Sequence, residues 1–381
     1  MKNNRTFLEK LLDGAEVKWI PLGDVADYEQ PTKYLVNSTV YNDNYPIPVL
    51  TAGKTFILGY TNEDEGIYFA SKSPVIIFDD FTTANKWVDF DFKAKSSAMK
   101  MITSKNEKFA LLKYIYYWLN TLPNNQIDGD HKRQWISNYA NKLIPIPPLS
   151  VQTEIVKILD TLTALTSELT SELILRRKQY EYYREKLLSH NDSENLSQQK
   201  VDKDKLFSTS NIQWLHLNEI YKFQYGIGNK IPTIGGEYPV YGSNGIVGSH
   251  NEYNSEDAPV IGHIGAYAGI VNWAEGKHFV TYNGIICNKI NDNVNSRYAY
   301  YLLLSQNFID KANKASQPFI SYDILNKCIV PVPPIEEQHR IVSILDKFET
   351  LTNSITEGLP LAIEQSQNRY EYYRELLLNF S

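Results

Sequence analysis

The chain contains one stretch of sequence twice, and this duplication constrains its fold more than any other feature. One copy begins at Ile144 and reads IPIPPLSVQTEIVKILD, and the other begins at Val330 and reads VPVPPIEEQHRIVSILD. Each copy leads to a second shared block, YEYYRE, which begins at Tyr180 and again at Tyr370. The offset between copies is 186 residues at the first block and 190 at the second, so the second copy has four extra residues. A repeat of this length exceeds the period of solenoid units and indicates a duplicated domain.

The segment between the two shared blocks is expected to form one long helix in each copy. Apolar residues recur there at steps of three or four, which is the spacing of a stripe that packs against another helix. The stripe consists of Val151, Ile155, Leu159, Leu162, Leu165, Leu169, Leu173, Tyr180, Tyr183 and Leu187 in the first copy, interrupted by Arg177, and of Ile341, Leu345, Phe348, Leu351, Ile355, Tyr370, Tyr373 and Leu377 in the second. A helix over residues 150–189 would be roughly 60 Å long, at 1.5 Å per residue.

The two helices are predicted to pack against each other in opposite directions. The first helix must carry the chain away from the first globular body, so the second can bury the stripe only by running back. This arrangement is an antiparallel two-helix spacer with a globular body at each end. In the alternative, each helix packs on its own domain, which is the more common use of such a stripe. The matched lengths of the helices and their matched positions after each domain favour the spacer.

The segments that precede the two helices are expected to be β-rich. Runs of β-branched and aromatic residues between turn residues indicate strands at 47–50, 55–60, 74–78, 87–92 and 98–102, and helical spacing follows at 108–119. The second body repeats this plan, because Tyr238-Pro-Val-Tyr241 matches Ile47-Pro-Val-Leu50 and a helix is expected at 298–309. The fold class is therefore α+β. The loops of the two bodies differ, as two readers of different targets would require.

These patterns divide the chain into five segments. The first β-rich domain covers residues 1–143 and its helix covers 144–190, while the second domain covers 212–329 and its helix covers 330–381. A charged linker rich in Ser, Gln and Asn, at 191–211, joins the two halves. The first 14 residues carry charges within a short amphipathic pattern, which predicts neither a signal peptide nor a membrane span.

The composition limits which partners are expected. Of the 381 residues, 43% are apolar, and the formal charge is −6 with a pI near 5.7. Proteins that grip DNA phosphates alone usually have a basic excess, so this charge weighs against unaided DNA binding. Basic residues do gather in the first body, namely Lys93, Lys95, Lys100, Lys105, Lys108 and the triplet His131-Lys-Arg133. Two cysteines in apolar contexts, Cys287 and Cys328, suit buried thiols in a reducing cytoplasm.

The sequence contains no recognisable catalytic motif. It has no phosphate-binding G-x-x-x-x-G-K-[ST] loop, no G-x-S-x-G turn, no metal-ligand spacing and no Asn-Pro-Pro-aromatic or Asp-Pro-Pro-aromatic segment. The glycines at 226–228 and 262–269 do not follow the dinucleotide-binding pattern and predict tight turns instead. A stand-alone enzyme is therefore disfavoured.

The order of these segments resembles the specificity (S) subunit of type I restriction–modification systems. The resemblance rests on Pro147-Pro-Leu-Ser-Val-Gln152, on Pro333-Pro-Ile-Glu-Glu-Gln338, on the two Tyr-Glu-Tyr-Tyr-Arg blocks and on Gly358-Leu-Pro360, and it covers nearly the whole chain. It implies two β-rich target recognition domains separated by a long antiparallel two-helix coiled coil, with a pseudo-twofold internal repeat. The first copy departs from the family pattern, because it has Thr166-Ser-Glu-Leu-Thr-Ser-Glu-Leu173 where Gly-Leu-Pro is expected.

The resemblance also implies a set of partners. The two domains would bind double-stranded DNA with a bipartite target, the helices would hold two methyltransferase (M) subunits, and restriction (R) subunits would join that complex. The chain itself is expected to be non-catalytic, to bind no metal or cofactor, and to contact no membrane. S-adenosylmethionine, ATP and Mg are expected on the partner subunits, in the cytoplasm. The M subunits would supply much of the phosphate neutralisation, which accounts for the acidic pI.

The candidate base-reading residues are polar loop residues whose donors could reach base edges. The reading residues of the family vary too much to be carried over one by one, so the candidates are chosen by their placement. They are Thr82, Thr83, Asn85, Lys86, Lys132, Arg133 and Gln134 in the first domain, and Asn244, His263, Tyr267, Ser316 and Gln317 in the second. For any single one of them, a solvated loop residue is the more common role.

The tetrapeptide repeat at 166–173 is a candidate ruler within the spacer. Thr166 and Leu169 recur four residues later as Thr170 and Leu173, so one more unit would keep the stripe nearly in phase and lengthen the helix by roughly 6 Å. In the alternative, the repeat is only a filler of the coiled coil. For the whole chain, the rival hypothesis is a non-catalytic protein-binding dumbbell with a coiled-coil spacer, supported mainly by the acidic charge.

Overall fold

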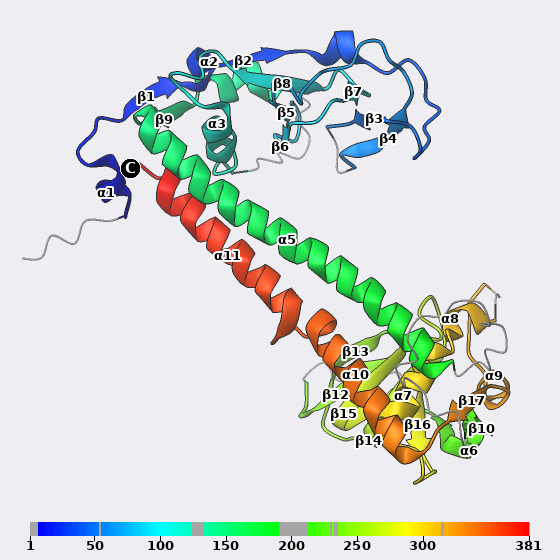
Figure 1. Cartoon of the computed structure of the whole chain (residues 1–381). Coiled ribbons are helices and arrows are strands. Elements are labelled where there is room, and N and C mark those ends of the chain that lie inside the picture. The colour runs from blue at the N-terminus through cyan, green and yellow to red at the C-terminus, as the bar shows by residue number, and fades with distance from the viewer. Residues whose placement is uncertain are drawn as a thin grey trace, which may run out of the picture. The chain divides into compact units, whose positions relative to one another are not determined.

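The computed structural model describes residues 7–52, 55–123, 133–189, 212–228, 231, 235–313 and 316–380. The chain divides into two units: unit 1 is Met1–Thr170 with Ala362–Ser381, and unit 2 is Ser171–Leu361. Each unit contains a β-rich body and a pair of helices (Figure 1). Among the described residues, no helix combines the length and the apolar character needed to span a membrane.

Unit 1 contains three small sheets in its described residues. Its strands are β1 (Lys18–Pro21), β2 (Ala26–Glu29), β3 (Ile47–Leu50), β4 (Ile57–Thr61), β5 (Val75–Asp79), β6 (Asn85–Val88), β7 (Lys93–Ala94), β8 (Met99–Ser104) and β9 (Leu143–Ile146). Strand β1 pairs with β9, a second sheet has the order β2-β8-β5-β6, and a third has the order β4-β3-β7. Its helices are α1 (Phe7–Leu12), α2 (Leu22–Val25), η1 (Pro31–Tyr34), α3 (Leu112–Leu119), α4 (Gln134–Ser137), η2 (Tyr139–Asn141), the first part of α5 (Leu149–Leu188) and most of α11 (Gly358–Leu378).

Unit 2 repeats this arrangement of strands. Its strands are β10 (Gln213–His216), β11 (Tyr221–Tyr225), β12 (Tyr238–Gly242), β13 (Gly245–His250), β14 (Ser255–Gly262), β15 (Val271–Val280), β16 (Gly284–Lys289) and β17 (Ile329–Val332). Strand β10 pairs with β17, and the remaining strands form one sheet in the order β11-β16-β14-β15-β12-β13. Its helices are α6 (Leu217–Ile220), α7 (Ser296–Ser305), α8 (Phe308–Lys311), α9 (Tyr322–Asn326), the rest of α5 and α10 (Ile335–Asn353).

The strand pairing confirms the duplicated α+β plan. In unit 2, β15 pairs with β14 along one part and in parallel with β12 along another, so it joins two groups of strands into one sheet. In unit 1 the same two roles are divided between β6, which pairs with β5, and β7, which pairs in parallel with β3. The bodies also extend slightly beyond the expected boundaries at 143 and 329, because β9 and β17 return to pair with the first strand of each body.

The helix expected at 298–309 is interrupted in the structure. Helix α7 ends at Ser305, and α8 starts only at Phe308. Asn307 lies between them with a left-handed φ of 47°, a conformation that an α-helix of L-residues cannot continue through. Asn tolerates this conformation better than most residues do. The spacing of apolar residues, however, cannot predict a left-handed residue within a helix.

A buried glutamine from the first shared block anchors the long helix on the body of unit 1. Gln152 Oε1 accepts a hydrogen bond from the Leu111 N–H at 2.9 Å. Its Nε2 donates to Phe109 O and to Pro147 O, both at 2.9 Å. One side chain therefore joins the start of α5 to the segment that enters α3, and it satisfies backbone groups that would otherwise be buried without partners.

The equivalent residue Gln338 makes the same connection in unit 2. It accepts from Asn295 N–H at 2.8 Å and donates to Asn293 O at 3.2 Å and Pro333 O at 2.8 Å. A tyrosine–aspartate hydrogen bond is repeated as well, from Tyr117 to Asp160 in unit 1 and from Tyr301 to Asp346 in unit 2. The duplication therefore extends to the polar contacts between helix and body.

The N-terminal part of α5 lies beside α11 within unit 1 (Figure 1). Ile155 and Leu159 are buried in the same cluster as Leu377, at the far end of α11. Further along, the Thr166 and Ser366 hydroxyl oxygens are 2.8 Å apart. Residue numbers rise along α5 as they fall along α11, so this pair is antiparallel.

The C-terminal part of α5 lies beside α10 within unit 2. The ring centroids of Tyr180 and Phe348 are 6.3 Å apart, and those of Tyr183 and Phe348 are 5.8 Å apart in a stacked arrangement. Arg177 donates to Thr352 O at 3.4 Å. This pair is antiparallel too, so the predicted direction of helix pairing is confirmed within each unit.

The second long helix is broken, whereas one continuous helix was expected over 330–381. Residues 354–357 separate α10 from α11, and they equal in number the four extra residues of the second copy. Gly358 has a φ of +82°, and a Cβ there would lie 2.6 Å from Thr350 O. Pro360 lies in the first turn of α11, where its missing N–H leaves no helical hydrogen bond unmade. Ile355 was expected in the stripe, but it lies in the break and is exposed. Leu165, on α5, was expected in the stripe too and is also exposed.

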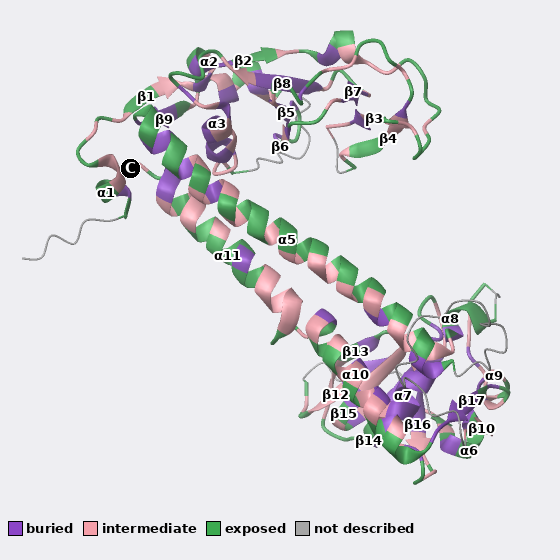
Figure 2. Ribbon diagram, viewed as in Figure 1, coloured by how far each residue is buried: buried purple, intermediate pink, exposed green. Residues whose placement is uncertain are grey.

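Buried residues concentrate inside each body and where a long helix meets it (Figure 2). In unit 1 the main cluster surrounds α3, with Tyr114 and Trp118 packed against residues at the start of α5. In unit 2 the corresponding cluster surrounds α7. Cys287 and Cys328 are buried free thiols, as their apolar contexts predicted.

Candidate nucleic-acid interface

In unit 1, the first group of candidate residues lies in the turn between β5 and β6. Asp79 Oδ1 accepts from Phe81 N–H at 2.9 Å and from Thr82 N–H at 3.2 Å. The Thr83 N–H donates to Asp79 O at 2.9 Å, and Thr83 has a left-handed φ of 63°. A β-branched residue rarely adopts this conformation, so the carboxylate of Asp79 and the body beneath hold a strained turn in place.

Asp80 connects this turn to the polar segment that precedes α4. Its carbonyl oxygen accepts from Gln134 N–H and its Oδ1 accepts from Trp135 N–H, both at 2.8 Å. Its Oδ2 lies 3.6 Å from Lys100 Nζ, which is 4.8 Å from the ring centroid of Tyr28. The side chains of Asp80 and Lys100 are 2% and 1% exposed. The hydrogen bonds to Asp80 therefore hold two separate segments together, and the buried ion pair fixes Asp80 on strand β8. We call residues 79–86 and 133–135 the first loop cluster.

The candidates of the first domain differ in how they are presented. Thr82, Lys86 and Arg133 are exposed, while Asn85 and Gln134 are partly buried. Thr83 is buried, so its hydroxyl cannot reach a base edge in this conformation. The remaining candidate, Lys132, lies outside the described residues. The turn and the segment before α4 are thus brought together, and base contact by their exposed members stays a prediction.

Two of the basic residues expected to favour DNA do not face solvent. Lys100 is buried in the pair with Asp80, and Lys93 is buried with its Nζ 2.9 Å from Glu63 Oε2. Lys93 also donates to Glu65 O at 2.5 Å. The ammonium groups of these lysines are already paired with carboxylates inside the body, so they cannot neutralise phosphates. The local basic character of unit 1 is weaker than the sequence indicated.

In unit 2, backbone hydrogen bonds gather several loops at one end of the body. The Gly265 N–H donates to Pro318 O and the Ile320 N–H donates to His263 O, both at 2.9 Å. The Tyr282 N–H donates to Gly228 O at 2.9 Å. A Cβ on Gly262 would lie 2.5 Å from Ser243 O, so the β12–β13 turn approaches the same place. We call residues 225–228, 243–244, 262–269, 281–283 and 316–322 the second loop cluster.

All five candidates of the second domain belong to this cluster, although one of them is not accessible. The exposed members are Asn244, Tyr267, Ser316 and Gln317. His263 is buried, with its ring centroid 4.4 Å from that of Tyr225 and its Nδ1 3.1 Å from the carbonyl oxygen of Tyr282. His263 therefore supports the loops from inside, and its assignment as a base reader is disfavoured by its burial.

The structure adds three tyrosines that sequence placement missed. Tyr225 and Tyr322 stack with ring centroids 4.3 Å apart, and the Tyr225 N–H donates to the Tyr322 hydroxyl at 2.7 Å. Tyr282 lies 6.0 Å from Tyr225 and is exposed. Burial raises the pKa of Tyr225 and of Tyr322, so both hydroxyls stay neutral at physiological pH. The sequence-based candidates were limited to polar residues in loops, so tyrosines that a sequence pattern assigns to a strand or a turn were not among them.

The candidate ruler lies on α5, where units 1 and 2 share the helix. Thr166 is partly buried and contacts Ser366, whereas Thr170 is exposed and donates to Thr166 O at 2.8 Å. Leu169 and Leu173 are partly buried, as expected for residues along the seam. The repeat is therefore built into an uninterrupted stretch of helix, and its role as a ruler stays a prediction.

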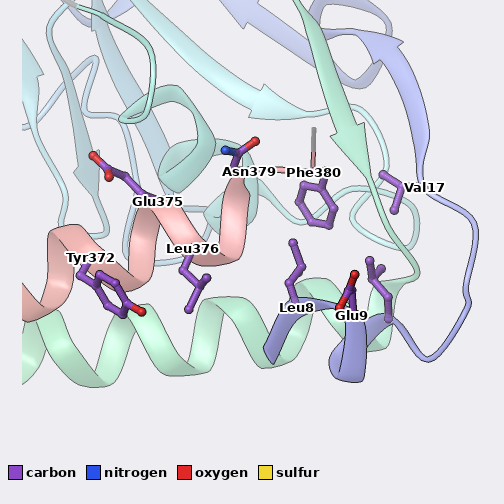
Figure 3. A pocket seen from close by; sticks show the side chains of 9 residues that line it. Leu8, Glu9, Val17, Tyr372, Glu375, Leu376, Asn379 and Phe380 are labelled. Carbon is purple, nitrogen blue, oxygen red and sulfur yellow. The ribbon is translucent and has the colours of Figure 1, made fainter. Parts of the chain in front are cut away.

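A second surface lies on the helices. In unit 1, a pocket of about 600 Å³ opens between α1 and the end of α11 (Figure 3), and it is lined by Leu8, Glu9, Leu12, Val17, Tyr372, Glu375, Leu376, Asn379 and Phe380. Tyr372 is 62% exposed, and the matching Tyr182 in unit 2 is 57% exposed. The two YEYYRE blocks thus each present an exposed aromatic ring at the same position of the repeat.

The model of a known family matches both halves of the chain. It is the type I restriction modification DNA specificity domain, and it matches residues 15–176 and 217–365. The chain belongs to this family. It is 49% identical to the type I restriction enzyme EcoR124I/EcoR124II specificity subunit of Escherichia coli, over 98% of this chain and 97% of that protein. It is 29% identical to the EcoprrI specificity subunit of Escherichia coli, over 92% of each.

Solved structures show the same fold at lower sequence identity. The S subunit of a type I restriction–modification system from M. genitalium superposes with a TM-score of 0.65 at 17% identity, covering 97% of this chain and 98% of that one. A chain from a solved type I R-M system superposes with a TM-score of 0.51 at 18% identity, covering 96% and 98%. At these low sequence identities, the superpositions show that the chains share a fold and nothing more.

Proposed function

We propose that this chain is the DNA sequence-recognition subunit of a type I restriction–modification complex, in which each β-rich domain reads one half of a bipartite target. The observation that carries this proposal is the pair of loop clusters, because one duplicated framework holds two sets of loops with different side chains. Loops on a rigid scaffold are where binding residues usually lie. The match over both halves to the specificity family supports it further, and argues against a protein-binding dumbbell.

In this proposal the chain is non-catalytic and acts through its partners in the cytoplasm. Methyl transfer would use S-adenosylmethionine on the M subunits, and restriction would use ATP and Mg on the R subunits. The acidic pI and the burial of Lys93 and Lys100 are consistent with weak binding of DNA by the chain alone. Partner subunits would then provide most of the phosphate contacts.

Two M subunits are proposed because the exposed tyrosine is duplicated. Tyr182 and Tyr372 occupy matched positions in the two YEYYRE blocks, so each would form the centre of an equivalent docking site. Tyr182→Ala and Tyr372→Ala should each reduce the number of bound M subunits from two to one, measured by mass photometry. Tyr253→Ala removes an exposed tyrosine of a body and should leave two bound. Two bound M subunits in the Tyr182→Ala/Tyr372→Ala double variant would rule out this docking site.

The function is tested by measuring what the chain does with and without its M subunits. Purified alone, it should neither methylate nor cleave DNA and should bind DNA weakly, whereas with M subunits it should bind one bipartite sequence specifically. Fluorescence anisotropy with target and scrambled duplexes measures this difference. Methyl transfer by the repurified chain alone, or equal affinity of the complex for both duplexes, would overturn the proposal.

The shared helix α5 is proposed to set the gap between the two half-sites. One additional Thr-Ser-Glu-Leu unit after Leu173 lengthens the helix by roughly 6 Å, and a base-pair step is ~3.4 Å. The preferred gap should therefore grow by about one or two base pairs, while the half-site sequences stay the same. Methylome mapping of a strain that carries three units measures the gap. Normal methylation with an unchanged gap would show that the repeat is only a filler.

A further inference from the structure

The second loop cluster lacks charged side chains throughout its described residues. None of its members at 225–228, 243–244, 262–269, 281–283 or 316–322 is Asp, Glu, Lys or Arg. Direct reading of guanine usually relies on Arg or Lys, and reading of the cytosine amino group on Asp or Glu. These residues therefore offer neither of the two charged modes of base recognition.

The cluster instead presents apolar surface at a fixed place. Ile227 and Tyr282 are both exposed, at 59% and 45%. The Ile227 N–H donates to Val280 O at 3.0 Å, and the Tyr282 N–H donates to Gly228 O at 2.9 Å, so the two segments are paired. A Cβ on Gly226 would lie 2.1 Å from Thr281 O, which means that only glycine allows this close approach.

Stacked rings beneath Tyr282 limit its movement. The centroids of Tyr282 and His263 are 5.1 Å apart with an interplanar angle of 81°, and His263 also lies against Tyr225 at 4.4 Å. Tyr225 in turn stacks on Tyr322 with an interplanar angle of 14°. Edge-to-face and stacked contacts of this kind stabilise a defined ring orientation. The exposed face of Tyr282 is thus a preorganised apolar surface.

Amide side chains lie on the same cluster. Asn244 and Gln317 are exposed, and an Asn or Gln amide can pair with the N6 and N7 atoms of adenine. The base-pair partner of adenine carries the one apolar group of the major groove, the C5-methyl group of thymine. Amides and apolar side chains together match the two features that a T·A pair displays.

We propose that unit 2 reads at least one T·A pair of its half-site by packing a thymine C5-methyl group against Ile227 and Tyr282. Asn244 and Gln317 provide donors and acceptors for adenine edges beside it. This proposal rests on the proposed function, because it names the base chemistry read by one of the two domains. Tyr225, His263 and Tyr322 are positioning residues that hold the Tyr282 ring.

The test uses the full chain in complex with its M subunits and the target sequence found by methylome mapping. Each thymine of both half-sites is replaced in turn by 2′-deoxyuridine, which removes only the methyl group, and affinities are measured by competition. We expect at least one substitution in the half-site read by unit 2 to weaken binding about fourfold, since a buried methyl-sized group contributes ~0.8 kcal/mol. The same substitution in the gap should change nothing.

Variants then assign the effect to residues. Ile227→Ala and Tyr282→Ala should reduce the ratio of affinities for thymine and deoxyuridine DNA to below twofold. Tyr282→Phe keeps the ring and should preserve the ratio. Tyr253→Ala is the matched control, because Tyr253 is an equally exposed tyrosine (47%) of the same unit outside the cluster. Thermal unfolding confirms that each variant is folded.

The outcomes separate this proposal from the function on which it rests. Unchanged affinity with deoxyuridine at every position, or a half-site for unit 2 without a T·A pair, would overturn the thymine proposal. A fourfold loss that persists in Ile227→Ala and Tyr282→Ala would overturn the assignment to these side chains. If the wild-type complex did not distinguish target from scrambled DNA at all, the proposed function would fail instead.

Discussion

The two loop clusters rest on the same framework and differ in their chemistry. The first cluster contains Asp79, Asp80, Lys86 and Arg133, and its two segments are joined by hydrogen bonds to Asp80, whose carboxylate also pairs with the buried Lys100 of β8. The second cluster is joined by backbone hydrogen bonds and stacked rings, with no charged residue in its described ranges. Helix, glutamine anchor and strand order are repeated in both units. Duplication has therefore preserved the scaffold, while the described loop cluster carries charged residues in one unit and none in the other.

The largest difference is expected when the buried ion pair between Asp80 of the first cluster and Lys100 of β8 is broken. Lys100→Met leaves the Asp80 carboxylate buried without a cation, which should destabilise unit 1 by about 3–5 kcal/mol and abolish reading of its half-site. Unit 2 contains no corresponding ion pair in its described loop cluster, so the protection of its backbone amides from hydrogen exchange should be unchanged. Hydrogen exchange, followed for each unit separately, measures both effects.

Two variants control this prediction. Lys108→Met removes an exposed lysine of the same unit and should change stability by less than about 0.5 kcal/mol. The double variant Asp80→Asn/Lys100→Met removes both charges and should recover part of the loss. Equal destabilisation of the two units by Lys100→Met would show that the clusters are not held independently.

The second prediction concerns the framework that the units share. Gln152→Ala and Gln338→Ala each leave buried backbone groups without their partner, which should cost about 1–3 kcal/mol in the unit that carries the change. Because the two glutamines make matching bonds, the two losses should agree within about 1 kcal/mol. Urea unfolding with hydrogen exchange measures them, and Glu154→Ala on the exposed face of α5 is the control. A large loss in only one unit would contradict the equivalence of the two anchors.

The sequence predicts the framework well because the framework depends on periodic patterns. The duplicated Pro-Pro and YEYYRE blocks, the apolar stripe and the strand at Ile47–Leu50 all correspond to elements in the structure. The break after Asn353 depends on the left-handed conformation of Gly358. Because the apolar stripe resumes after this glycine, the spacing of apolar residues does not indicate a break.

The loop clusters are less predictable because they depend on contacts between distant segments. Lys93 and Lys100 count among the basic residues of the first body, and nothing in their local sequence reveals the acids that pair with them. His263 is a candidate for its polar ring, yet the ring packs against Tyr225, 38 residues earlier in the chain, and against Tyr282. Exposed loop residues such as Arg133 and Asn244 were found where polar sequence placed them.

The smallest expected effect sharpens the contrast between ionic and uncharged reading. Arg133→Ala should weaken DNA binding by the complex by about 1 kcal/mol and, if Arg133 contacts a phosphate, lower the slope of log affinity against log salt by about one. Gln317→Ala, in the second cluster, should leave that slope unchanged because no charge is removed. Titrations between low and physiological salt measure both slopes. Identical slopes for Arg133→Ala and Gln317→Ala would mean that Arg133 makes no ionic contact with DNA.

The most direct test of the account is to exchange one body and map methylation across a genome. Residues 17–142 are replaced by the corresponding body of another specificity-family chain, while both long helices and unit 2 stay as they are. We expect the half-site read by unit 1 to change, and the other half-site and the gap between them to stay unchanged. A replacement that altered both half-sites would contradict the central claim that the two units read DNA independently.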